Sequence, residues 1–202
     1  YCFMLDKNKH RGEVIDFELF TQIIDRIIQQ RIINKLIEHK LVLVFHGGEA
    51  LIVGKEKFYR MAEYVTTKMH ENNVKFELAM QTNSTLLDEE YIRIINKFEI
   101  NVGLSFDGID GANSGRTSIK QKSFEDNFDL LEENKVQYGF LLVATKLSAD
   151  KFEESKQFLE NLESVKSYKI NYAEDMICPG EKSDIEMSGS DMFEKIYRPE
   201  ID

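Results

Sequence analysis

The chain has 202 residues, of which 42% are hydrophobic and 31% are charged, and this composition excludes disorder, collagen and coiled coil as interpretations of the whole chain. Acidic residues outnumber basic ones by 36 to 26, so the net charge of -10 repels a phosphate backbone and we expect no nucleic-acid partner. The longest apolar runs, at 41–45 and 140–144, are far shorter than the ~20 residues that span a bilayer, so we expect no membrane partner either.

Apolar residues recur at helical spacing in six segments. We predict helices from about Asp16 to about His39, over Phe58 to Met69, from an N-cap at Asp88 to Phe98, from Ser123 through Leu131, from Ser148 through Leu162, and around Phe193 and Tyr197. Five short apolar runs between these segments predict strands at 41–45, 74–80, 101–106, 138–144 and 168–172. Helices and strands therefore alternate along the chain.

This alternation is typical of an α/β fold with a parallel sheet, either open or closed into a barrel. No linker or low-complexity tract divides the chain, so we interpret residues 1–202 as one domain. The sequence starts at Tyr1 without a methionine, and a long loop and a helix follow. We therefore expect a fragment whose first strand is missing.

Two cysteines, Cys2 and Cys178, form no C-x-x-C pair within the chain, which favours a reducing cytoplasm. We interpret Cys178 as a buried or surface thiol, because its neighbours Pro179 and Gly180 indicate a loop. Glu174 and Asp175 follow the last predicted strand, where a solvated acidic loop and a substrate-facing pair remain alternatives.

Polar residues follow the predicted strands, where a parallel α/β fold places its ligands. They are His46, Gly47, Gly48 and Glu49 after the first strand, Gln81, Thr82, Asn83 and Ser84 after the second, and Ser105, Asp107 and Gly108 around the end of the third. A glycine pair admits a ligand close to the backbone, and the carboxylate after it can bind an ammonium group. Taken singly, each segment is equally compatible with an ordinary turn, a structural histidine or a loop cap.

Together with Cys2, the order and spacing of these segments resemble the radical S-adenosylmethionine (SAM) enzymes, in the SPASM branch of peptide and protein maturases that includes anaerobic sulfatase maturases. The resemblance rests on four blocks: LVFHGGEALIVGKEKFYRMAEY, MQTNSTLLDEEYI, LSFDGIDGANSGR and SFEDNFDLLEENKVQYGFLLVAT. It implies a partial (β/α)6 barrel. Ala50 stands where this family usually has proline, and residues 112–115 replace its usual His-Asp.

The family resemblance implies two cofactors. Cys2 would be the last of three cysteines that bind a 4Fe-4S cluster, and the other two would precede Tyr1, so the fragment alone would be inactive. SAM would be held through its ammonium by Gly47, Gly48 and Glu49, and through its carboxylate by Arg116. Ser105, Asn83 and Asp107 would lie near the ribose, and Val143, Ala144 and Phe3 near the adenine.

The resemblance further implies that a reduced cluster cleaves SAM and that the 5′-deoxyadenosyl radical modifies a peptide or protein side chain, with an electron donor such as flavodoxin or ferredoxin. Formylglycine formation and a thioether or carbon-carbon crosslink remain alternative reactions. No general base is assigned, and no C-terminal domain for auxiliary clusters is found in the sequence. A non-catalytic barrel that binds a peptide or SAM is the competing hypothesis, whereas an ordinary metabolic barrel lacks its late glycine-rich phosphate loop.

Overall fold

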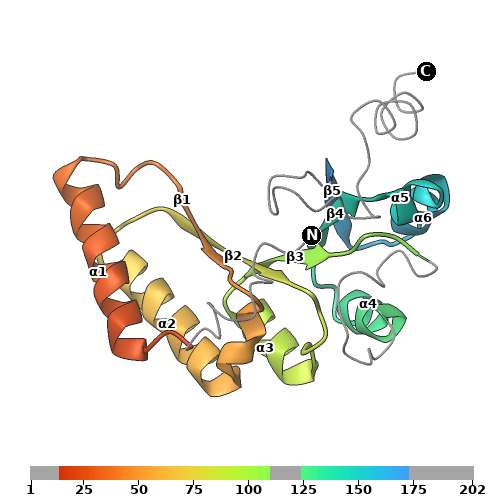
Figure 1. The fold of residues 1–202 in the computed structure, drawn as a ribbon. Helices are drawn as coiled ribbons and strands as arrows, with labels where there is room; N and C mark the ends of the chain where they lie inside the picture. The colour runs from red at the N-terminus through yellow and green to blue at the C-terminus, as the bar shows by residue number, and fades with distance from the viewer. Residues whose placement is uncertain (1–13, 110–123, 173–202) are drawn as a thin grey trace, which may run out of the picture.

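The computed structural model describes residues 14–109 and 124–172, which form a five-stranded sheet with helices packed on it (Figure 1). The strands are β1 (Leu41–Phe45), β2 (Phe76–Thr82), β3 (Asn101–Ser105), β4 (Tyr138–Ala144) and β5 (Val165–Tyr172). They lie in sequence order and every neighbouring pair is parallel. The predicted parallel α/β fold is therefore confirmed.

The helices follow the strands as predicted. They are α1 (Phe17–Ile33), a 3-10 turn η1 (Ala50–Val53), α2 (Lys55–Glu71), α3 (Glu89–Lys97), α4 (Phe124–Glu133), α5 (Lys146–Ala149) and α6 (Phe152–Glu160). Within the described ranges, no helix is long and apolar enough to span a membrane. The helix predicted around Phe193 lies outside the described residues.

Local chemistry explains where the helices begin and end. The carboxylate of Asp16 accepts hydrogen bonds from the first turn of α1, and that of Asp88 caps α3 as predicted. Helix α1 ends at Ile33 and not near His39, because Asn34 caps it and Lys35 takes a φ of 55°. The helix predicted to begin at Ser148 is instead two helices, since Thr145 and Ser148 form a capping box that starts α5 earlier.

Alternation along the strands separates two faces of the sheet. In β2 and β3, Leu78, Met80, Val102 and Leu104 are buried against the helices and belong to the core with residues of α1, α2 and α3. The opposite face carries Ala79, Gln81, Gly103 and Ser105 in the same two strands, and Val42 and Val44 of the edge strand β1 are 48% and 52% exposed there. The second face is thus open among the described residues.

Four strand boundaries differ from the prediction, at both ends of β2, at the end of β3 and at the start of β5, and the end of β2 bears on the candidate site. Strand β2 runs to Thr82 and not to Met80, because it stays paired with β3 up to Leu104. Strand β5 begins at Val165, three residues earlier than predicted. Gln81 and Thr82 are therefore strand residues with opposite orientations and not members of a loop.

Candidate functional site

Glu49 links the ends of two neighbouring strands. It follows β1 in the turn that leads into η1, and its side chain is half-buried. Its Oε1 accepts hydrogen bonds from the Leu51 amide at 3.1 Å and from the Thr82 hydroxyl at 2.6 Å, and its Oε2 accepts one from the Asn83 amide at 2.8 Å. Three donors therefore fix the carboxylate at the rim of the sheet, where charge-assisted hydrogen bonds are strong.

The turn before Glu49 leaves open space beside the backbone. Gly47 has a φ of 151°, and among the described residues a Cβ built on either Gly47 or Gly48 would meet no atom within 4 Å apart from those of the adjoining residues. Nδ1 of the exposed His46 accepts a hydrogen bond from the Gly47 amide at 2.7 Å. A ligand can thus approach the backbone of both glycines, which is the property expected of this pair from the sequence.

The Glu49 carboxylate has an unused hydrogen-bond acceptor position that suits a cationic ligand. A carboxylate offers about four lone-pair positions, and the described residues fill three of them, two on Oε1 and one on Oε2. An ammonium group placed beside Gly47 and Gly48 would find the remaining position on Oε2. The residues present at this corner therefore fit the methionine end of SAM.

Asn83 reaches this site through its backbone. Its amide donates to Glu49, while its side-chain Oδ1 accepts hydrogen bonds from the amide and the hydroxyl of Thr85 at 3.0 and 2.7 Å. The side chain is thereby committed to the turn that follows β2. A contact between Asn83 and a ribose stays a prediction.

Ser105 lies on the open face with Gln81 as its partner. Nε2 of Gln81 donates to Ser105 Oγ at 2.9 Å across β2 and β3. Gly103, which pairs with Gln81, makes this arrangement possible, because a Cβ at this position would lie 2.3 Å from Gln81 Oε1. Gln81 was among the polar residues predicted to follow the second strand but received no role in SAM binding, since the sequence pattern placed it beyond the strand and gave it no orientation.

Asp107 joins the ends of β3 and β4. It is 2% exposed, and its Oδ1 accepts a hydrogen bond from the Val143 amide at 2.9 Å. The Val143 carbonyl accepts one from Ser148 Oγ at 3.4 Å. Both backbone groups of Val143 are therefore engaged within the protein, and an adenine contact there would rely on its side chain. Ala144 is the last residue of β4.

Several predicted site residues cannot be placed. Cys2, Phe3 and Arg116 lie outside the described residues, as do Glu174, Asp175 and Cys178. In the part of the chain that is described, no group of three or more histidine, cysteine, aspartate or glutamate side chains could hold a metal ion. The roles given to these residues stay predictions.

The structure thus brings together two pairs of predicted site residues, Glu49 with Asn83 and Asp107 with Val143, along one rim of the sheet. Thr82 was missed as the hydroxyl that holds Glu49. The fold belongs to the parallel α/β class, in which ligands bind outside the carboxyl ends of the strands, and the glycine-glycine-glutamate corner lies at that edge.

Comparison with known proteins narrows this class. No protein-family model matches the sequence. The cysteine-type anaerobic sulfatase-maturating enzyme of Clostridium perfringens is 28% identical over 156 residues, which are 74% of this chain and 41% of the relative. Its counterpart in Clostridium novyi is 28% identical over 72% of this chain and 40% of the relative. The chain spans about two fifths of the length of these curated relatives.

Solved structures agree with this relationship in fold. A structure of native anSMEcpe with bound AdoMet superposes with a TM-score of 0.82 at 20% identity, and covers 98% of this chain and 54% of that one. Streptococcus suis SuiB bound to precursor peptide SuiA superposes with a TM-score of 0.55 at 16% identity, over 86% of this chain and 36% of that one. The chain is therefore similar in sequence to cysteine-type anaerobic sulfatase-maturating enzymes and similar in fold to anSMEcpe with bound AdoMet, as the four sequence blocks predicted.

Proposed function

We propose that this chain forms the SAM-binding core of a radical SAM enzyme that modifies a side chain of a peptide or protein. The observation that carries the proposal is the corner at the end of β1, where two glycines leave open space and Glu49 keeps one acceptor position for an ammonium group. The homology to sulfatase-maturating enzymes supports it independently.

The roles of the other residues follow the order of the strands. Ser105, oriented by Gln81, would meet the ribose, with Asn83 and Asp107 nearby, while Val143 and Ala144 would border the adenine. Cys2 would bind a 4Fe-4S cluster, with Phe3 beside the nucleotide and Arg116 on the methionine carboxylate. With SAM bound, a reduced cluster supplies hydrogen-atom abstraction, for which we propose an external one-electron donor of the flavodoxin or ferredoxin type.

We propose a peptide or protein as the substrate. One of the solved structures similar to this chain is anSMEcpe with bound AdoMet and a Kp18Cys peptide, with a TM-score of 0.78 at 20% identity over 92% of this chain and 51% of that one. The open face of the sheet leaves room for such a substrate. We further propose that the sheet is part of a six-unit barrel in which another strand pairs with β1, since β1 is an edge strand with Val42 and Val44 exposed.

Reconstitution of the full-length protein tests the proposal. The protein is loaded with iron and sulfide without oxygen, and SAM binding and reductive SAM cleavage to 5′-deoxyadenosine are measured. Binding followed by cleavage is the expected result. Binding without cleavage would favour a non-catalytic barrel, and no binding at all would overturn the proposal.

The variant Glu49→Gln tests the site itself. We expect it to weaken SAM binding more than it lowers the free energy of unfolding, because the lost negative charge faces the ligand while its oxygen can still accept some of the three hydrogen bonds. The matched control is Glu77→Gln on β2, whose carboxylate binds Lys40 at 2.5 Å and the Asn101 side chain at 2.9 Å. Equal losses of binding and folding in Glu49→Gln would count against the assigned role.

A further inference from the structure

The glycine-glycine-glutamate turn has little of its own to hold it in place. Among the described residues, a Cβ on either Gly47 or Gly48 would contact no atom beyond the adjoining residues, and His46 is exposed. Besides Thr82 and Asn83, which hold Glu49 from the end of β2, the contacts that hold the turn lie after it, in η1. There Leu51 is 1% exposed and packs in the core between the site and the helices.

Leu51 is held at both of its backbone groups. Its amide donates to Glu49 Oε1 at 3.1 Å, and its carbonyl accepts a hydrogen bond from the hydroxyl of Tyr91 at 2.7 Å and one from the Gly54 amide at 3.2 Å. The carboxylate at the site and the hydroxyl on α3 thus act on the same residue from opposite sides. A shift of Leu51 would move the amide that orients Glu49.

Tyr91 is a rigid donor. Its side chain is 4% exposed, and its ring packs edge-on against Phe58 of α2 with centroids 5.9 Å apart. Burial, and secondarily the negative charge of Asp88, raises the pKa of the Tyr91 hydroxyl, so the group keeps its proton in the physiological range. A buried phenol of this kind has few alternative partners and fixed geometry.

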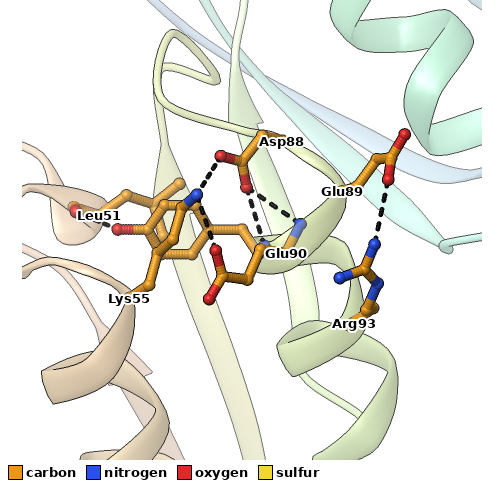
Figure 2. A network of polar contacts seen from close by, with 7 residues as sticks. Leu51, Lys55, Asp88, Glu89, Glu90 and Arg93 are labelled. Atoms are coloured by element: carbon orange, nitrogen blue, oxygen red, sulfur yellow. Dashed lines mark hydrogen bonds and ion pairs between the residues drawn. The ribbon is translucent and has the colours of Figure 1, made fainter.

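A second contact between the same elements lies at the surface. Lys55, at the start of α2, binds Asp88 at 2.5 Å and Glu90 at 3.0 Å near Leu51 (Figure 2). These side chains are between 36% and 58% exposed. Exposed ion pairs contribute little to geometry or stability, so of these two contacts from α3 the buried hydrogen bond of Tyr91 is the one that can fix the turn.

We propose that Tyr91 is a positioning residue for the SAM site, which holds Leu51 so that the Leu51 amide keeps Glu49 oriented toward the ligand. The inference rests on the proposed function. Tyr91 lies on α3, and in the described part of the chain its hydroxyl bonds the Leu51 carbonyl and none of the predicted SAM-binding residues. It therefore acts on the site through Leu51. Its contribution is to the geometry of the acceptor that SAM meets.

The test compares Tyr91→Phe with Tyr59→Phe in the full-length, reconstituted protein. Both variants keep the ring and lose one hydroxyl, which in Tyr91 joins α3 to η1 and in Tyr59 joins α2 to α3. Tyr59 donates to Glu63 at 3.1 Å and accepts from Lys97 at the surface. The readouts are the SAM dissociation constant, the unfolding midpoint, and amide hydrogen exchange of the segments 46–54 and 80–86 without SAM.

We expect Tyr91→Phe to weaken SAM binding by about threefold to tenfold, the change that corresponds to loss of one neutral hydrogen bond. Exchange should accelerate in both segments, because the Leu51 and Asn83 amides that donate to Glu49 lie in them. In Tyr59→Phe, binding and exchange should stay at the wild-type values. If the Tyr91 hydroxyl only stabilised the fold, its loss would lower the unfolding midpoint without selectively accelerating amide exchange in these two segments.

The outcomes separate the two proposals. If wild-type protein binds SAM and Tyr91→Phe binds it equally well, the inference is overturned and the proposed function stands. If exchange accelerates evenly over the whole chain, the hydroxyl is a general stabiliser and the inference is again overturned. If reconstituted wild-type protein does not bind SAM, the proposed function and the inference fall together.

Discussion

The hydroxyl of Thr82 lies 2.6 Å from Glu49 Oε1 and donates a hydrogen bond to it, which ties the end of β2 to the turn after β1. Thr82 is 2% exposed, so the bond is shielded from water on the side of the core. The carboxylate at the rim is thus held by a side chain that faces the opposite direction from the open face. This relationship makes the orientation of Glu49 dependent on the interior of the protein.

Replacing Thr82 with valine tests this dependence. We expect Thr82→Val to lower the free energy of unfolding by about 1.5 to 3 kcal/mol, because it keeps the shape but removes the hydrogen bond to the charged Glu49 and the one that Thr82 Oγ1 accepts from the Ser84 amide at 3.1 Å. SAM binding should weaken as well, since Glu49 loses one of its three donors. The measurements are urea denaturation and calorimetric titration with SAM.

Thr85→Val is the matched control. The Thr85 hydroxyl donates to Asn83 Oδ1 at 2.7 Å in the same turn and does not bond to Glu49. We expect a smaller loss of stability and no change in SAM affinity. Equal effects of the two valine variants on SAM binding would show that the turn as a whole, and not the bond to Glu49, matters.

Gly103→Ala should displace Gln81 from Ser105. The added Cβ would lie 2.3 Å from Gln81 Oε1, which is the end of a flexible side chain, so the side chain can move and the free energy of unfolding should fall by only about 1 kcal/mol. In the background of Gln81→Ala, the same change should cost less, because the contact of the added Cβ with the Met80 carbonyl oxygen at 3.3 Å then remains without the clash with Gln81. Urea denaturation of the wild type, both single variants and the double variant gives a double-mutant cycle, which measures the interaction free energy between Gly103 and Gln81. Additive effects would mean that Gly103 does not act through Gln81.

The sequence predicted the fold well because the pattern of short apolar strands and amphipathic helices is long and regular. It also placed Glu49 and the two glycines at the rim after the first strand, since residues after a strand in a parallel fold point to one rim, and their role in binding SAM stays a prediction. It failed at Gln81 and Thr82, which look like loop residues because polar side chains end the apolar run. Their opposite orientations follow from pairing with β3, which is a long-range contact that local pattern does not contain.

The helix boundaries likewise were predicted where the signal is local in the sequence and missed where it is not. The capping role of Asp88 was predicted correctly, because an N-cap is a local signal in the chain. The early end of α1 depends on Lys35 in a left-handed conformation, which a lysine shows no local preference for. The link from Tyr91 to Leu51 spans 40 residues, and the helical spacing predicts only that the ring faces inward.

Asp88 predicts an acid-dependent loss of stability. Partial burial acts to raise the pKa of Asp88, but the ion pair with Lys55 and the amides of Tyr91 and Glu90 together hold this pKa below its usual value. A lowered pKa contributes stability that is present above the unfolded pKa of about 3.9 and is lost as the pH falls through the folded value. We expect Asp88→Asn, which keeps a cap but cannot titrate, to lose less stability between pH 6 and pH 3 than the wild type.

Melting temperatures at pH 6 and pH 3 measure this difference. Glu89→Gln is the control, because Glu89 lies in the same turn of α3 and binds Arg93 at 3.0 Å at the exposed surface. Its acid sensitivity should match the wild type. If Asp88→Asn is as acid-sensitive as the wild type, then Asp88 is not a group whose titration links pH to folding.

Tyr138 predicts a loss of stability at alkaline pH. Its side chain is 1% exposed and its hydroxyl donates to Glu132 at 2.6 Å. Burial first, and then the hydrogen bond and charge of Glu132, raise the pKa of Tyr138. The folded pKa of Tyr138 exceeds the unfolded value of about 10. The stabilising contribution of the protonated Tyr138 hydroxyl is therefore complete below pH 10 and is lost as the pH rises from 10 toward the folded pKa. The urea midpoint of the wild type should therefore fall between pH 8 and pH 11 by more than that of Tyr138→Phe.

Glu132 has a second role that separates the effect of pH from the effect of packing. Its carboxylate also accepts hydrogen bonds from the amides of Glu163 and Ser164, at 3.1 and 3.2 Å, and so holds the loop before β5. Glu132→Ala should lower the free energy of unfolding at pH 8 by about 1 to 3 kcal/mol, because it leaves the buried Tyr138 hydroxyl without its acceptor. Tyr138→Phe should lower the free energy of unfolding at pH 8 by less than Glu132→Ala does. It should also reduce the fall of the urea midpoint between pH 8 and pH 11. An alkaline decline in Tyr138→Phe as steep as in the wild type would assign the titration to another group.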